Sequence, residues 1–170
     1  MSSRAQQINA IIVRELTSLR AELDAYPADA DVWRVVPGIT NSAGNLALHL
    51  AGNLRHFIGG ILGRTGYRRD RDAEFASTGV PRPELTRLID AGIAEVERTM
   101  GSLSDSELEA EFPEPVAKVR VQTGDFLMHL ASHLAYHLGQ VDYHRRIVTG
   151  TGATIGAVAP GKLSTARPVG

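Results

Sequence analysis

The chain has 170 residues, of which 43% are hydrophobic and 22% are charged, a length and composition that suit one domain with a single sizeable core. Its 18 basic and 19 acidic residues give a formal net charge of -1, which argues against a nucleic-acid partner. Cysteine is absent, so disulfides, thiolate metal ligands and a cysteine nucleophile are excluded.

The N-terminal stretch "MSSRAQQINA" lacks the apolar segment of a secretion signal. No other stretch approaches the roughly 18 apolar residues that would span a bilayer. We therefore expect a cytoplasmic protein that has no membrane partner and forms one domain over residues 1–170.

Four segments have apolar residues spaced by threes and fours, which is the period of a helix that buries one face. They cover residues 8–26, about 41–63, 83–103 and about 123–150. Each segment is long enough to be one helix of a bundle, so the chain is predicted to contain four such helices.

Three residues mark boundaries of these helices: Pro27 ends the first, Thr123 is the expected N-cap of the last, and Gly150 ends it. The linker at residues 63–83 is too long for a minimal bundle turn. The tail at residues 151–170 is rich in Gly and Pro and is expected to be irregular. The predicted fold is therefore all-α, a four-helix bundle with a long crossover connection.

Histidine is concentrated in two of these helices. The stretch "HLASHLAYHLGQVDYH", residues 129–144, carries four of the six histidines of the chain. Residues four apart lie on one face of a helix, so His133 and His137 are close enough to share one ion. His129 and His133 have the same spacing. All three cannot readily bind one ion, because the outer two are roughly 12 Å apart along the axis, and spacing alone leaves both pairs open.

The second helix carries a polar stripe among its leucines, formed by Asn45, His49, Asn53 and His56. If this stripe faces the histidines of the last helix, His49 supplies a third nitrogen. Three histidines with an open coordination position are typical of a catalytic metal site, and bundle cores often hold such sites. For His56 and His144 we expect a surface, rim or supporting role.

Three stretches, "GNLALHLAGNLRHFIGGILG", "RDRDAEF" and "HLASHLAYHLGQVDYHRR", resemble the DinB-like superfamily of metal-binding four-helix bundles. The resemblance covers nearly the whole chain, and its most specific part is the His-x-x-x-His-x-Gly-Gln ending of the last helix. It implies that His49, His133 and His137 bind one divalent ion. It also implies a homodimer.

Three neutral imidazoles leave the charge of a divalent cation uncompensated, so the open position should favour an anion, from a bound thiol or bound water. The resemblance implies a thiol-dependent S-transferase that uses a low-molecular-weight thiol and a small electrophile, or alternatively a metal-dependent hydrolase. A non-catalytic bundle that binds a metal or a partner is the third alternative. Nitrogen ligands suit zinc, nickel, copper and iron about equally, so the metal is not identified.

Other polar side chains are candidates for the pocket or for support of the ligands. Asn45 and Asn53 lie one turn on either side of His49, and a metal-bound imidazole needs a partner for its other nitrogen. The charged stretch "RRDRDAEF" is either a solvated surface or a lid over the metal. The full set of candidates is Asn45, Asn53, His129, Tyr136, Gln140, Arg71 and Asp72.

Overall fold

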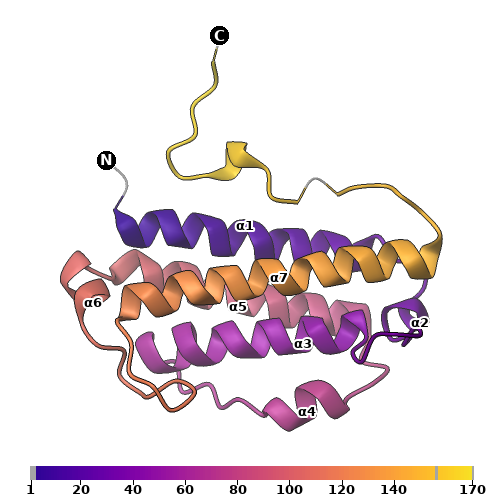
Figure 1. Ribbon diagram of the computed structural model, residues 1–170, viewed down its shortest axis with the longest axis horizontal. Helices are drawn as coiled ribbons and strands as arrows, with labels where there is room; N and C mark the ends of the chain where they lie inside the picture. Colours follow the sequence, from indigo (N-terminus) through magenta and orange to yellow (C-terminus); the bar gives the residue numbers. More distant parts are fainter. Residues whose placement is uncertain (1–2, 156, 170) are drawn as a thin grey trace.

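The computed structural model describes residues 3–155 and 157–169. Its four long helices lie side by side along the long axis of the molecule (Figure 1), and they are α1 (Arg4–Asp24), α3 (Ala43–Leu54), α5 (Arg82–Ser102) and α7 (Thr123–Thr149). The described residues form no β-strand. The predicted all-α bundle is confirmed.

Shorter elements occupy the connections between the long helices. α2 (Asp29–Val32) contacts α7, α4 (Arg71–Ala76) packs against α3, and α6 (Asp105–Glu109) packs against the start of α7. A 3-10 turn of the tail, η2 (Pro160–Lys162), contacts α1. The long crossover predicted at residues 63–83 therefore contains a short helix, α4, that lies beside α3.

The ends of the long helices are set by local chemistry. α3 begins with a capping box at Ser42, and Gly150 ends α7 with φ at 69°, a left-handed conformation that suits glycine. The prediction of Thr123 as the N-cap of α7 is wrong, because Gln122 is the cap and Thr123 is the first helical residue. Thr123 is turned inward instead: it is buried, and its N–H donates to the carbonyl of Ala110 over 2.9 Å.

α3 widens at its C-terminal end into a π-helix, η1 (Arg55–Leu62), which the apolar period did not predict. The N–H of Gly63 donates to the carbonyl of Ile58, five residues earlier, over 2.8 Å. A Cβ at Gly63 would lie 2.2 Å from Oγ1 of Thr99. Glycine at this position therefore lets α5 pack closely against the end of the widened helix.

The core lies between the four long helices. Each contributes fully buried aliphatic side chains, for example Leu16, Leu50, Ile89 and Leu134. Burial of one such side chain stabilises the fold by roughly 1.5–3 kcal/mol. None of the helices within residues 3–155 and 157–169 combines the length and the apolar character of a membrane-spanning segment.

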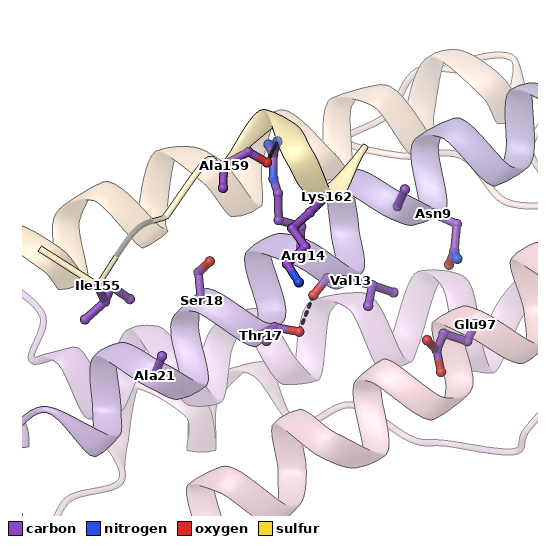
Figure 2. A pocket seen from close by; sticks show the side chains of 11 residues that line it. Asn9, Val13, Arg14, Thr17, Ser18, Ala21, Glu97, Ile155, Ala159 and Lys162 are labelled. Atoms are coloured by element: carbon purple, nitrogen blue, oxygen red, sulfur yellow. Dashed lines mark hydrogen bonds between the residues drawn. The ribbon is translucent and has the colours of Figure 1, made fainter. Parts of the chain in front are cut away.

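The C-terminal tail leaves α7 and runs back over α1 (Figure 1). Arg145 forms a buried ion pair with Glu22 and donates to the carbonyl of Ala153 over 2.8 Å, while Arg14 donates to the carbonyl of Ala159 over 3.4 Å. A cavity of about 470 Å³ lies between α1 and the tail, and small side chains of α1 line it (Figure 2). Its described lining contains no histidine.

Candidate metal centre

Three histidines from two neighbouring helices converge in the bundle. His49 on α3 and His133 and His137 on α7 each place one ring nitrogen within 4.8 Å of the other two. The ring centroids of His49 and His133 are 5.1 Å apart, and those of His133 and His137 are 4.6 Å apart. His49 is buried and the other two are half-buried. This group, the histidine trio, therefore lies at the edge of the core.

The structure distinguishes the two pairs that helical spacing left open. His129 is exposed, and its ring stacks on Phe126 at 5.9 Å and on His133 at 6.2 Å between centroids. His137 instead approaches His49, with centroids 5.3 Å apart. The residues brought together are thus the three that the resemblance implied, and His129 lies beside them.

The spacing within the trio fits a divalent ion. Imidazole nitrogens bind zinc at about 2.0–2.1 Å, so two ligands of a tetrahedral site lie about 3.3 Å apart. The Nε2 atoms of His49 and His133 are 3.3 Å apart. Among the described residues, the cluster contains only these imidazoles and His137, so they could hold an ion that keeps an open position.

A buried carboxylate holds the far side of the His49 ring. Nδ1 of His49 lies 3.1 Å from Oε2 of Glu74, which accepts, and 3.0 Å from Nη2 of Arg69, which donates. Arg69 donates two hydrogen bonds of 2.7 Å to the same carboxylate. Burial alone would raise the pKa of Glu74, but the hydrogen bonds from Arg69 and His49 hold it below its ordinary value. In the tautomer in which Nδ1 donates to Glu74, Nε2 of His49 keeps a lone pair for an ion.

Asn45 fixes α4 against α3. Its side-chain amide nitrogen lies 3.1, 3.2 and 2.9 Å from the carbonyl oxygens of Glu74, Phe75 and Ser77. These carbonyls belong to the end of a short helix, where backbone acceptors lack partners within the helix. Asn45 therefore acts on His49 through the position of Glu74, and not as the direct partner of the imidazole that its one-turn spacing suggested.

Gly52 and Asp70 complete the support of this carboxylate. A Cβ at Gly52 would lie 2.1 Å from Oε1 of Glu74, so glycine at this position of α3 gives the carboxylate its room. Asp70 caps α4 by accepting from the N–H of Ala73 over 2.9 Å. The ring of Phe75 packs on that of His49, with centroids 4.9 Å apart.

The two imidazoles of α7 are also in the form that binds metals. Oε1 of Gln140 accepts from Nδ1 of His137 over 2.6 Å, which leaves Nε2 of that ring with its lone pair. Burial, together with the nearby His137 and His49, lowers the pKa of His133 to about 4. Burial also lowers the pKa of His137. Both rings are therefore neutral at neutral pH, as metal binding requires.

Three further pocket candidates lie on α7 and α4. Tyr136 is 66% exposed, and its ring meets that of His137 edge-on at 5.2 Å. Arg71 holds its guanidinium 5.1 Å from the centre of the Phe75 ring. Asp72 is exposed in the first turn of α4. Arg71 is therefore linked to the trio through Phe75, while Asp72 faces solvent.

Three other polar residues of α3, η1 and α7 lie outside the trio. Asn53 is buried, and its Oδ1 has no hydrogen-bond partner among the described residues. His56 is half-buried, and burial lowers its pKa. His144 is buried, with Nδ1 2.7 Å from the hydroxyl of Tyr26 and Nε2 2.7 Å from the carbonyl of Arg34. His144 thus joins α7 to the α1–α2 region and lies seven residues, or about two turns, beyond His137 on α7.

Glu74 and Arg69 are the residues of this centre that sequence reasoning did not single out. Both lie in the charged stretch at residues 68–75, whose alternating charges suit local ion pairs on a solvated surface or in a lid. A metal-bound imidazole requires an acceptor for its second nitrogen, but that rule does not say which of several carboxylates provides it. The structure selects Glu74, because α4 turns this one side chain inward.

The family of the chain follows from comparison with known proteins. A search of curated proteins finds no match. A profile of the DinB superfamily matches residues 11–141, a stretch that contains all three histidines of the trio together with Glu74 and Arg69. The chain belongs to the DinB superfamily.

Proposed function

We propose that this protein is a divalent-metal-dependent enzyme that binds its ion through the histidine trio and transfers a low-molecular-weight thiol to a small electrophile. The observation that carries the proposal is the hydrogen bonding of the trio. Oε2 of Glu74 and Oε1 of Gln140 lie beside Nδ1 of His49 and Nδ1 of His137, and when each Nδ1 donates to its oxygen, both Nε2 atoms are available to one ion. Membership of the DinB superfamily supports the same interpretation.

A divalent ion held there would lower the pKa of a thiol or of water and so supply an anionic nucleophile near neutral pH. The trio itself contributes no negative charge, and the carboxylate of Glu74 is already paired with Arg69. The loaded site would therefore keep a net positive charge that attracts an anionic ligand. Glu74 and Gln140 would meanwhile hold the planes of two ligand rings and limit their reorientation.

The thiol of the proposed reaction comes from solution, because the chain has no cysteine. Bacillithiol, mycothiol and glutathione are the natural candidates for the first test. Hydrolysis is the alternative reaction, since the same positive site would also activate water. A non-catalytic bundle that only binds a metal or a partner is the alternative from a different class.

The test uses protein purified without a histidine tag and loaded with zinc, nickel or iron in separate samples. Each sample is incubated with the three thiols and a small alkylating electrophile, and the conjugate is quantified by mass spectrometry. A parallel assay follows hydrolysis of a chromogenic ester. We expect metal-dependent conjugation by the wild-type chain and none above background by His49→Ala.

The outcomes separate the three alternatives. Ester hydrolysis without conjugation would replace the transferase proposal by the hydrolase. The absence of any metal-dependent turnover from a fully loaded protein would overturn the enzyme proposal and favour the non-catalytic bundle.

A further inference from the structure

A second cavity, of about 290 Å³, lies between the loop before α3 and the C-terminal half of α7. We call it the α3–α7 pocket. Its apolar lining comes from Ile39, Leu46, Tyr143 and Ile147. The polar side chains of its lining are uncharged, apart from the titratable His144.

His144 does not make this pocket cationic. Its two ring nitrogens are occupied by the Tyr26 hydroxyl and the Arg34 carbonyl, both at 2.7 Å. A carbonyl can only accept, so Nε2 carries the proton, while the Tyr26 hydroxyl at Nδ1 can donate or accept. Burial lowers the pKa of His144, which favours the neutral ring at neutral pH. The pocket thus contains no group that would pair with a charged ligand.

Large apolar side chains are unusually exposed at this pocket. Ile39 is 39% exposed, Tyr143 is 69% exposed and Ile147 is 60% exposed. Exposed apolar residues that gather around one hollow mark a binding site more often than scattered ones do. The cavity under the tail differs, because Arg14, Glu97 and Lys162 lie in its lining.

The pocket adjoins the histidine trio along two helices. Leu46 precedes His49 by three residues on α3, and Gln140 follows His137 by three residues on α7. α3 and α7 run in opposite directions (Figure 1), so the step from His49 to Leu46 and the step from His137 to Gln140 lead toward the same end of the bundle. The pocket therefore begins about one helical turn, or roughly 5.4 Å, from the trio.

Gln140 belongs to both places. It lines the α3–α7 pocket, and its side-chain oxygen lies 2.6 Å from Nδ1 of His137. A ligand in the pocket would therefore touch the residue that orients one of the proposed metal ligands. The cavity, about 290 Å³, lies just below the roughly 300–1,000 Å³ that is usual for ligand sites, so it suits a small group.

We propose that the α3–α7 pocket binds an uncharged apolar part of the substrate, an alkyl chain or a single ring, while the reacting end of the same molecule lies at the trio. This inference rests on the proposed metal-dependent function and adds the substrate class. Substrates with a charge at the apolar end would be disfavoured, because the lining offers no counter-ion.

The first experiment measures the pocket without metal. Straight-chain alcohols from butan-1-ol to octan-1-ol are titrated into the metal-free full chain, and binding is followed by NMR chemical shifts. Affinity should rise about threefold to fourfold per added methylene until the cavity is filled. Ile147→Asn should weaken hexan-1-ol binding by about tenfold, which corresponds to loss of roughly two buried methylenes.

The control is Val35→Asn. Val35 is 61% exposed, close to the 60% of Ile147, and it does not line the pocket. This variant should bind hexan-1-ol like the wild type. Equal weakening by both variants, or affinity that is independent of chain length, would overturn the proposal. So would an Ile147→Asn protein that binds alcohols normally but changes from dimer to monomer in sedimentation, because the surface would then be a subunit interface.

The second experiment links the pocket to the trio by comparing hexane-1-thiol with hexan-1-ol on zinc-loaded and metal-free protein. The thiol should be preferred at least tenfold on the loaded protein and not on the metal-free protein. If the wild-type protein does not take up zinc, both the proposed function and this inference are overturned. Zinc uptake without any alcohol binding, or without the thiol preference, would overturn the pocket proposal alone.

Discussion

Replacement of Glu74 by Gln tests the most specific feature of the candidate centre. The substitution keeps the size of the side chain but removes the charge that accepts from Nδ1 of His49 and from two N–H groups of Arg69. An amide oxygen can still accept one of these hydrogen bonds. The His49 ring would therefore keep a partner but lose the charged one that favours its metal-binding tautomer.

Two effects of Glu74→Gln act in the same direction on metal affinity. Loss of a charged acceptor behind a metal-bound imidazole typically weakens binding by about 10- to 100-fold, or about 1.4–2.8 kcal/mol. The guanidinium of Arg69, whose side chain is only 11% exposed, also loses its counter-ion and lies 3.0 Å from Nδ1 of His49. Its unpaired positive charge opposes a cation at the trio.

The assay is competition for zinc with a chromophoric chelator at neutral pH, with folding checked by circular dichroism. Asp72→Asn is the matched control, because it makes the same change from acid to amide on α4 at an exposed position, and it should leave affinity unchanged. The double variant Arg69→Met with Glu74→Gln should recover part of the loss. Zinc affinity within twofold of wild type in folded Glu74→Gln would refute the role assigned to Glu74.

Three further predictions concern other residues. Elemental analysis of His129→Ala should still find one ion per chain, and its metal affinity should fall by at most about 10- to 100-fold, as it does when a residue that supports a ligand is removed. Complete loss of metal would show that His129 is itself a ligand. Asn45→Ala should release α4 from α3 and weaken zinc binding without removing a ligand. Amide hydrogen exchange in residues 71–76 should accelerate, and unchanged exchange there would show that Asn45 does not hold α4 in place. Burial lowers the pKa of His144, so the contribution of this residue to stability is present above about pH 6.5, the unfolded value, and is lost as the pH falls toward the lower folded pKa. Urea unfolding of His144→Gln should therefore show a smaller loss of stability on acidification than the wild type. Parallel pH profiles of the two proteins would contradict this.

Periodicity was sufficient for the main architecture. The apolar stripes of the four long helices are repeated over many turns, so their existence did not depend on any one residue. The π-helical end of the second helix could not be anticipated, because its side chains follow the same apolar pattern as an α-helix. At its end, Thr99 of α5 lies close to Gly63, a contact between segments far apart in the sequence. The N-cap of α7 differed by one residue because Thr123 faces inward.

The histidines and the carboxylate of the candidate centre differ in how far the sequence could predict them. His133 and His137 share one helix, so their proximity follows from a spacing of four. The choice between His137 and His129 required the position of α3, which local sequence does not contain. Glu74 is separated from His49 by 25 residues. Its side chain points toward the core because Asn45 holds α4 against α3 and because Gly52 leaves space for the carboxylate. Such long-range supports are visible only in the fold.

Elemental analysis of protein without a tag shows whether His49, His133 and His137 together hold one divalent ion. Wild type and the three single alanine variants are loaded with the same metal and passed through the same desalting column. We expect close to one ion per wild-type chain and strongly reduced content in each variant. Wild-type protein that retains no metal, or a His49→Ala or His137→Ala variant that retains a full equivalent, would contradict this expectation.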